Sequence, residues 1–457
     1  MRYSEIVRRT VAAGAIALLL SAVAAAADVV GWHNPLTEKA KGPFGTCWTF
    51  DRENIDFGTN APEIVVRYLL EGRNVPGGAT RMASLGVDLF DIDNDGGFHL
   101  LEGSYDLGKS VGDTITFSYR VDYGKSAKNG NEFRLYLPLY SEVKWMEIGT
   151  VGGTYFHFEP VPVEKAIAFY NVPVEAVDRP AKAVRNIIQR KADFPVKVVS
   201  RKESRNSGWL LAVDGAKADT VATLEAVFNA LGTTADLPDI LKPVRQRRDF
   251  YYYDWTLRHS RVLYRERRIA PDPEIVMIGN SITHYWSGEP SHKTWHAGVD
   301  SWNDLFADRN VINCGYGWDR LGNMMWRMMH EELDGFSAKH VFVMAGTNDI
   351  YSRPEEEIAE GMVGLVEYIR AKQPNARIHV VHIYPRRKAI DRVDKVNAAA
   401  DRLLGESGLT NYDIVDVKSV LTKADGTLDE SLFRDGLHPN EEGYRRIAEV
   451  YRKYIQD

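Results

Sequence analysis

The sequence has 457 residues, in which 57 Lys and Arg stand against 63 Asp and Glu. This length exceeds what one hydrophobic core usually serves, so we expect several domains. The mild acidity argues against a nucleic-acid partner, because nucleic acids are bound by basic surfaces.

The N-terminal segment has the features of an export signal. Three arginines precede an uncharged apolar run over residues 11–23, and small residues follow at 24–27. We therefore predict a signal peptide over residues 1–27 and a periplasmic or secreted protein. Its removal takes away three Arg and one Glu, which leaves 54 basic and 62 acidic side chains and a net charge of −8. The apolar run is shorter than the roughly 20 residues that a membrane-spanning helix needs, so no membrane span is expected.

Residues 28–161 show short alternating runs separated by Gly, Asn and Asp. The clearest strands are Thr114–Val121, Phe133–Leu139 and Val143–Ile148. A period of two is typical of antiparallel strands with one buried face, so an N-terminal β-sandwich domain is predicted.

Two stretches of this domain carry a signature. Gly86–Phe90 reads Gly-Val-Asp-Leu-Phe, and Tyr136–Tyr140 is followed by Met146–Gly149. They resemble the small N-terminal β-domain, known by its Gly-x-Asp-Leu-Tyr signature, that precedes the catalytic domain in some bacterial SGNH-type esterases.

Residues 162–245 admit two interpretations. In the esterases just named, the next strand ends in Gly-x-Ser-Ile-Thr, whereas the equivalent run here, Lys165–Val174, has no serine. A helix-like run, Ala183–Lys191, and a strand-like run, Val196–Val199, continue the pattern. The segment is therefore either a degenerate, inactive remnant of a first hydrolase domain or an α/β linker.

After residue 270, strand-like runs alternate with amphipathic helical runs. This alternation predicts a parallel sheet with helices on both faces, a three-layer flavodoxin-like α/β domain over residues 246–457. Ligands of such sheets gather at the carboxyl ends of the strands. The predicted strands are Glu274–Ile278, Asn310–Cys314, His340–Ala345, Arg377–Ile383 and Asp413–Val417, and the predicted helices are Glu355–Lys372, Val393–Gly405 and Glu441–Tyr454.

Four motifs fall at those strand ends: Gly279–Thr283, Asn313–Arg320, Gly346–Asp349 and Asp435–Pro439. The first reads Gly-Asn-Ser-Ile-Thr, and its glycine permits a sharp turn that leaves the serine at the edge of the sheet. The second is a Gly-bearing loop that can aim backbone N–H groups into a cleft, and the third offers a side-chain amide. The fourth, Asp-Gly-Leu-His-Pro, lets a carboxylate reach an imidazole within one loop.

In this order and spacing the four motifs resemble the SGNH or GDSL hydrolase superfamily, nearest to its bacterial, platelet-activating-factor-acetylhydrolase-like branch. The resemblance implies that Ser281 is the nucleophile, His438 the base and Asp435 the residue that orients the base. It also implies an oxyanion hole made of the Ser281 N–H, a backbone N–H of the second motif and the Asn348 side chain. The implied activity is ester hydrolysis through an acyl-enzyme, which needs no metal or organic cofactor.

Two residues depart from the family pattern. Asn280 stands where the family usually has Asp, so an acceptor oxygen is kept beside the nucleophile and a charge is lost. Trp318 aligns with the family's oxyanion glycine and still presents a backbone N–H, although a Trp cannot adopt positive φ cheaply. We expect its indole to wall the acyl pocket, which favours a small acyl group such as acetyl. The sequence leaves open which N–H between Gly315 and Trp318 donates.

Other patterns have structural interpretations that we prefer. Asp91–Glu102 satisfies the spacing of a calcium-binding EF-hand loop, but its Asp-Asn-Asp-Gly stretch suits a hairpin turn. Three histidines over residues 284–296 have no companion ligands, so no metal site is predicted. Cys47 and Cys314 lie far apart and are expected to be buried free thiols, with a catalytic thiol at Cys314 as the alternative.

Aromatic and basic residues gather near the first two motifs. Trp286 or Trp318 is expected to touch substrate, while Trp302 has helical spacing with apolar neighbours and is expected to be structural. The arginines over residues 247–268 are interpreted as a solvated helix face that leads into the catalytic domain.

The leading prediction is a carboxylic-ester hydrolase that removes O-acetyl or similar small acyl groups from a carbohydrate. The substrate would be an acylated small molecule or a polysaccharide. One alternative is an esterase for lipid or phospholipid acyl groups. Another is an inactive carbohydrate-binding or scaffold protein, against which the complete set of catalytic residues argues.

Overall fold

The computed structural model divides the chain into two compact units. The first combines residues 1–190 with 195–223, and the second combines residues 191–194 with 224–457. Each unit is described by itself. The structure describes residues 31–42, 45–48, 54–75, 80–92, 98–123, 130–138, 141–153, 155–159, 165–171, 193–194, 196–206, 208–215, 220–234, 236–246, 255–266, 271–290, 296–306 and 308–456.

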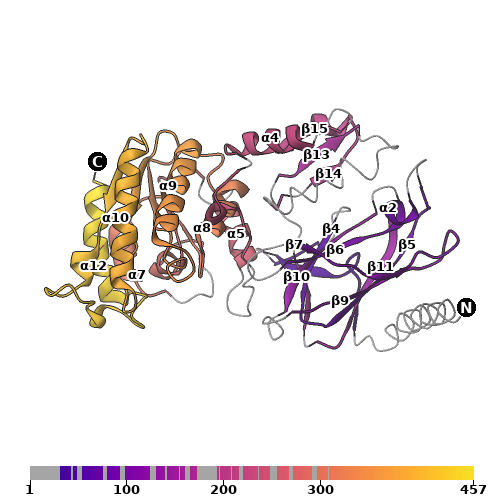
Figure 1. Ribbon diagram of the computed structural model, residues 1–457, viewed down its shortest axis with the longest axis horizontal. Helices are drawn as coiled ribbons and strands as arrows, with labels where there is room; N and C mark the ends of the chain where they lie inside the picture. The colour runs from indigo at the N-terminus through magenta and orange to yellow at the C-terminus, as the bar shows by residue number, and fades with distance from the viewer. Residues whose placement is uncertain are drawn as a thin grey trace, which may run out of the picture. The chain divides into compact units, whose positions relative to one another are not determined.

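Within the described residues, two five-stranded antiparallel sheets form a β-sandwich in the first unit (Figure 1). Ile64 and Phe117 of one sheet share a buried core with Phe57 and Phe133 of the other. The predicted β-sandwich is thereby confirmed. The first sheet runs β1 (Gly31–His33), β11 (Val143–Val151), β5 (Glu63–Leu70), β9 (Ile115–Arg120), β8 (Ser104–Asp106), and the second runs β12 (Phe156–Phe158), β4 (Asn54–Thr59), β10 (Asn131–Tyr136), β6 (Asp88–Ile92), β7 (Phe98–Leu100).

The signature stretch of this unit lies at β6, where Leu89 and Phe90 are fully buried. Strand β6 pairs with β7 in antiparallel fashion, so that Ile92 lies opposite Phe98, as the preferred hairpin requires. Residues 93–97, the middle of the calcium-loop candidate, lie outside the described residues. The smaller elements of the unit are β2 (Lys39–Gly42), β3 (Gly45–Trp48) and α2 (Arg81–Leu85).

A parallel sheet forms the centre of the second unit, and its described strands follow the order β17, β16, β18, β19, β20. Every residue of β16 and β17 is buried, as expected of strands that helices cover on both faces. The predicted parallel α/β fold is confirmed. The bounds are β16 (Ile275–Gly279), β17 (Val311–Gly315), β18 (His340–Val343), β19 (Arg377–Val381) and β20 (Tyr412–Val415).

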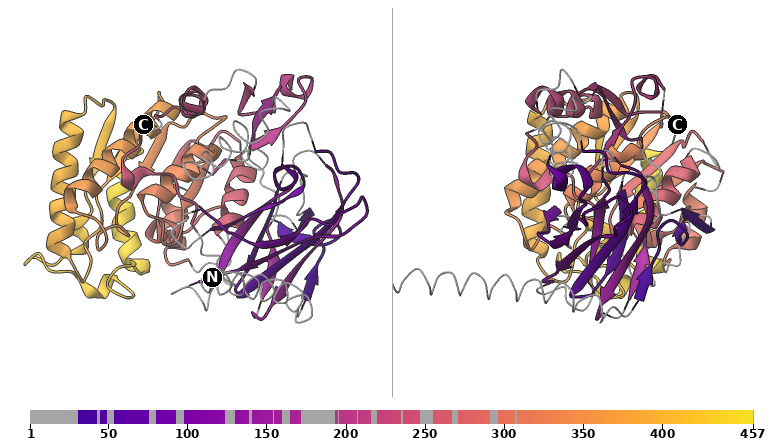
Figure 2. Two further views of the ribbon diagram at one scale, coloured as in Figure 1. Left: turned by 45° about the vertical axis from the view of Figure 1, so that its right-hand side comes forward. Right: turned by 90° about the vertical axis from the view of Figure 1, so that its right-hand side faces the viewer.

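Helices lie on both faces of this sheet (Figure 2). The α7 helix (Val299–Phe306) and the α12 helix (Glu441–Tyr451) share a core with Met277 and Phe342 of the strands. Side by side in Figure 1 lie the helices α9 (Glu355–Lys372) and α10 (Ile390–Glu406). No helix among the described residues is long and apolar enough to cross a membrane. The other helices are α4 (Thr220–Leu231), α5 (Trp255–Tyr264), α6 (Ser281–Trp286), α8 (Leu321–Arg327) and α11 (Lys418–Leu421).

Three short parallel strands follow the sandwich in the first unit, in the order β14 (Val196–Val198), β13 (Ile167–Tyr170), β15 (Leu211–Asp214). The strand that comes first in the chain lies between the next two, as β16 does between β17 and β18. Strands β13 and β14 fall where strands were predicted. The predicted helix over residues 183–191 lies outside the described residues, so remnant and linker both stand as interpretations.

Candidate active site

Ser281 is the first residue of α6 and comes directly after the turn that ends β16. Asn280 caps this helix, because its Oδ1 accepts the Ile282 N–H at 2.9 Å. Gly279 leaves room for the turn, since a Cβ there would collide with Thr283. The Asn280 oxygen thus provides the local ordering that a carboxylate could provide, without the charge.

Three predicted catalytic residues form one chain of hydrogen bonds. Ser281 Oγ lies 2.9 Å from His438 Nε2, and His438 Nδ1 lies 2.7 Å from Asp435 Oδ2. The bond to the carboxylate places a proton on Nδ1, which leaves Nε2 able to accept the serine proton. The arrangement can therefore activate the Ser281 hydroxyl for attack on a carbonyl carbon.

The Asp435 carboxylate is held by its own loop. Its Oδ1 accepts the N–H groups of Leu437 and His438 at 2.9 and 2.8 Å. Burial opposes ionisation of Asp435, but these N–H groups and the His438 imidazole outweigh it and lower the pKa of the carboxyl. An ionised Asp435 stabilises the protonated imidazole that forms during attack.

Arg387, which lies beyond β19, supports this loop and was not predicted from the sequence. Its N–H donates to Gly436 O at 2.8 Å, and its Nη1 donates to Asp435 O at 3.0 Å. The same guanidinium bonds both carboxylate oxygens of Glu430 at 2.7 Å. Its position shortly after an apolar strand could have marked Arg387 as close to the site. The sequence does not indicate, however, which loop such an arginine reaches.

The third motif is tied to the second. Asn348 Nδ2 donates to Asp319 O at 2.9 Å, and Asp349 Oδ2 accepts the Leu321 N–H at 3.2 Å. Arg386 donates to Thr347 O at 2.9 Å and thereby links the same motif to the loop after β19. The Asn348 amide therefore has a fixed orientation, which an oxyanion donor needs.

Two backbone N–H groups of the second motif take part in hydrogen bonds that shape the loop. The Gly315 N–H donates to Asn313 Oδ1 at 2.8 Å, and the Tyr316 N–H donates to Gly279 O at 3.0 Å.

Trp318 has φ of +61°, which lies in the left-handed region. The family's glycine at this position would adopt that conformation freely, whereas we expected a Trp to resist it. Trp318 adopts this conformation nonetheless, and its side chain is partly exposed. The backbone strain is therefore located at Trp318.

Comparison with known proteins agrees with this geometry. Residues 277–446 match the model of the GDSL-like lipase/acylhydrolase family, and residues 53–156 match the GxDLY model, the N-terminus of SGNH-hydrolase-type esterases. The C-terminal unit belongs to the GDSL-like lipase/acylhydrolase family. The predicted family, the predicted N-terminal domain and the predicted enzyme class, a carboxylic-ester hydrolase, are confirmed.

The chain is also similar to curated relatives and to solved structures. Human platelet-activating factor acetylhydrolase IB subunit alpha2 is 26% identical over 203 residues, which cover 44% of this chain and 83% of the relative. The rat alpha1 subunit is 27% identical over 186 residues, 40% of this chain and 75% of the relative. A GDSL-like lipase structure from Bacteroides thetaiotaomicron is 17% identical and covers 40% of this chain and 86% of its own, with a TM-score of 0.32. Another from Bacteroides ovatus is 18% identical and covers 88% of this chain and 83% of its own, with a TM-score of 0.26.

Beneath the second motif of this GDSL unit lies a buried charged network that sequence reasoning missed. Arg327 Nε donates to Asp319 Oδ2 at 2.8 Å, and Arg327 also bonds Glu332, whose carboxylate accepts the Tyr316 hydroxyl. Asp319 and Arg327 are fully buried. No local pattern in the sequence indicates which carboxylates Arg327 meets.

The aromatic residues near the motifs divide into core and surface. Trp286 is buried and donates to Ser301 Oγ at 3.0 Å, so it belongs to the core, and Trp318 remains as the candidate of the two for contact with substrate. Trp302 packs edge-to-face against it, as the structural interpretation predicts. Trp318 keeps a partly exposed ring, and the Tyr285 ring centroid lies 5.0 Å from that of His438.

The interpretation of the arginine stretch as a solvated face is wrong for two of its members. Arg258 and Arg265 are buried, because their guanidiniums donate to backbone carbonyls around β17, such as Gly315 O at 2.7 Å and Val311 O at 2.8 Å. These bonds replace water for the charge. Helical spacing alone could not reveal acceptors that come from a strand far along the chain.

The structure describes only part of the thiol and metal candidates. Cys314 is a buried free cysteine, and burial raises the pKa of its thiol, so a reactive thiolate is disfavoured. The Cys47 side chain and His292 lie outside the described residues. Among the residues that the structure does describe, no group of three or more His, Cys, Asp or Glu is placed to hold a metal ion.

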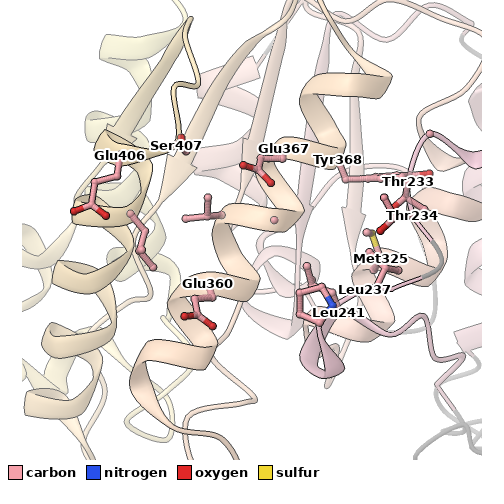
Figure 3. Close-up of a pocket in the computed structure, with 15 residues that line it drawn as sticks. Thr233, Thr234, Leu237, Leu241, Met325, Glu360, Glu367, Tyr368, Glu406 and Ser407 are labelled. Atoms are coloured by element: carbon pink, nitrogen blue, oxygen red, sulfur yellow. The ribbon is translucent and has the colours of Figure 1, made fainter. Parts of the chain in front are cut away.

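A cavity of about 570 Å³ in the same unit is separate from this chemistry (Figure 3). It is lined by residues of α9, by the end of α10, by Met325 and by residues 232–234, 237, 238 and 241, with Leu241 and Tyr368 among its apolar side chains and Glu360 and Glu367 among its acidic ones. No residue of the four motifs lines it. The position of the serine, not the volume of a cavity, therefore identifies the candidate active site.

Proposed function

We propose that Ser281, His438 and Asp435 catalyse the ester hydrolysis of this GDSL-family enzyme. Ser281 Oγ attacks the carbonyl carbon as its proton passes to His438 Nε2, and the protonated imidazole then donates to the leaving alcohol. Water then attacks the acyl-enzyme while His438 takes a proton from it, and the protonated imidazole returns a proton to Ser281 Oγ as the acyl group leaves. The observation that carries the proposal is the unbroken hydrogen-bonded chain from Ser281 Oγ to the Asp435 carboxylate.

The proposed substrate is a carbohydrate that carries acetyl or similarly small acyl groups. Trp318 stands at the second motif with its indole partly exposed, which favours a short acyl group over a long chain. Tyr351, 60% exposed just beyond the third motif, offers an aromatic face of the kind on which sugar rings stack. The curated relatives are named acetylhydrolases, in keeping with a small acyl group.

Two measurements test the activity and the acyl preference. Hydrolysis of p-nitrophenyl acetate should exceed that of the octanoate, and Ser281→Ala should lower kcat by about 10⁴- to 10⁶-fold. A screen of acetylated polysaccharides, with Ser281→Ala beside the wild type, should then identify an acetate-releasing substrate. Full turnover by Ser281→Ala would exclude the mechanism, and a preference for octanoate would exclude the small acyl group.

A phospholipid acetyl ester is the second candidate, because the curated relatives are named for platelet-activating factor. Release of acetate from platelet-activating factor, compared with release from an acetylated polysaccharide at equal ester concentration, separates the two substrates. We also propose export, on the basis of residues 1–27, which lie outside the described residues. Fractionation of cells that express the chain with and without these residues tests it.

A further inference from the structure

Trp318 adopts a backbone conformation that a tryptophan does not choose freely. Its φ of +61° lies in the left-handed region, which glycine enters without cost and residues with a Cβ enter rarely. Strained residues persist where the surrounding structure over-determines them, and they gather at functional sites. The contacts on either side of Trp318 should therefore show what imposes the conformation.

Both neighbours of Trp318 are held by one side chain. Gln246 Nε2 donates to Gly317 O at 3.0 Å and to Asp319 Oδ1 at 2.8 Å. Gln246 is 4% exposed. Because both partners are acceptors, only the NH₂ end of the amide can face them, so the orientation of the side chain is fixed. These two bonds, the Gln246 bridge, span the strained residue from one flank to the other.

Asp319 fastens the far end of the bridge to the core. Its carboxylate also accepts Trp255 Nε1 at 2.8 Å and Arg327 Nε at 2.8 Å, and it is fully buried. Its backbone carbonyl accepts Asn348 Nδ2 at 2.9 Å. The same residue thus anchors the strained loop through its side chain and orients the candidate oxyanion amide through its main chain.

We infer that Gln246 is a positioning residue for ester hydrolysis, which holds Trp318 in its left-handed conformation and so preorganises the oxyanion side of the site. The inference rests on the proposed function, because it takes Trp318 and Asn348 as the oxyanion side. The two described side-chain bonds of Gln246 go to Gly317 and Asp319 and not to the three proposed catalytic residues. Its effect acts on the developing oxyanion, where donors stabilise the transition state only if they are already aimed.

Gln246→Ala is the first test, with p-nitrophenyl acetate as substrate. We expect kcat to fall about 10- to 100-fold, less than the loss of an oxyanion donor itself, while KM changes by less than about threefold. Gln246→Met, which keeps the length of the side chain, serves where the alanine variant folds poorly and should lose kcat likewise. Circular dichroism melts report the stability of each variant.

Gln373→Ala is the matched control. Gln373 is buried like Gln246, and its Nε2 also donates to two acceptors, here both backbone carbonyls: Leu333 O at 2.8 Å and Phe336 O at 3.2 Å, in a segment that holds none of the four motifs. We expect Gln373→Ala to lower the melting temperature and to leave kcat unchanged. Equal kcat losses in the two variants would mean that the bridge is merely structural and would overturn the inference.

A double-mutant cycle with Trp318→Gly then tests the strain itself. Glycine adopts the left-handed conformation freely, so the loss of the Gln246 bridge should cost several-fold less kcat in the Trp318→Gly background than in the wild type. An equal loss in both backgrounds would overturn the inference. Ser281→Ala keeps the two proposals apart: if it stays active, the proposed mechanism fails, and if it is inactive while the cycle shows no coupling, only the role of Gln246 fails.

Discussion

The two sides of the proposed active site are built in opposite ways. The Asp435 side chain is 54% exposed, and its partners are N–H groups two and three residues away in its own loop. The Asp319 side chain has no exposure, and its partners come from residue 246, α5 and α8. The Asp435 loop is therefore held by local bonds and partly solvated, whereas Asp319 is held by partners that are distant in sequence, in a dry interior.

Because of this difference, changing Asp435 and changing Asp319 should have different effects on activity and stability. Water screens and replaces lost partners of an exposed carboxylate, so changing Asp435 should harm catalysis and spare the fold. A buried charge that loses its partner has no such compensation, so changing Asp319 should harm both. Variants that alter one carboxylate at a time test this contrast.

Asp435→Asn should have the largest catalytic effect of these variants. An amide can present its NH₂ group to His438 and stabilise the wrong tautomer, which costs about 10³- to 10⁴-fold in kcat in a serine triad. The melting temperature should change by no more than about 2 °C, because the side chain is half exposed. Steady-state kinetics and thermal melts check both, and a large loss of stability would contradict a solvated triad loop.

Asp319→Asn should show the opposite balance. We expect kcat to fall about 10- to 100-fold, through the oxyanion side, and the free energy of unfolding to fall by about 3 kcal/mol, because Arg327 loses one of its two buried carboxylates. Urea unfolding measures the change in the free energy of unfolding. A variant as stable as the wild type would show that the buried network is not what holds this loop.

The same division explains what the sequence could predict. Ser281, Asp435 and His438 sit in short motifs at strand ends, where the alternation of strands and helices already indicates which loops meet. Gln246, Arg258 and Arg387 act through partners that are distant in sequence, and no local pattern names those partners. The left-handed Trp318 was identified as a departure, but its conformation depends on that same non-local network and could not be predicted.

Arg387→Ala should have a smaller effect, because its pair with Glu430 is exposed and such pairs contribute about 0–1 kcal/mol. We expect kcat/KM to fall only a few-fold, since the Arg387 N–H to Gly436 O bond survives and only the support of Asp435 O is lost. Arg402→Ala is the control, because Arg402 is also exposed and pairs with glutamates, Glu356 and Glu406. This variant should leave kcat/KM unchanged. Comparable losses in both would assign the effect to surface charge.

The pH dependence of stability should give the smallest signal and the sign of the Asp435 interaction. Its pKa is lowered in the folded state, so its stabilising contribution is complete above the unfolded value of about 3.9 and disappears as the pH falls through the folded value. Asp435→Asn lacks this contribution at every pH. The difference in melting temperature between wild type and variant should therefore shrink as the pH falls below the unfolded value, whereas a difference that widens toward acid would mean that the carboxylate is destabilising in its loop.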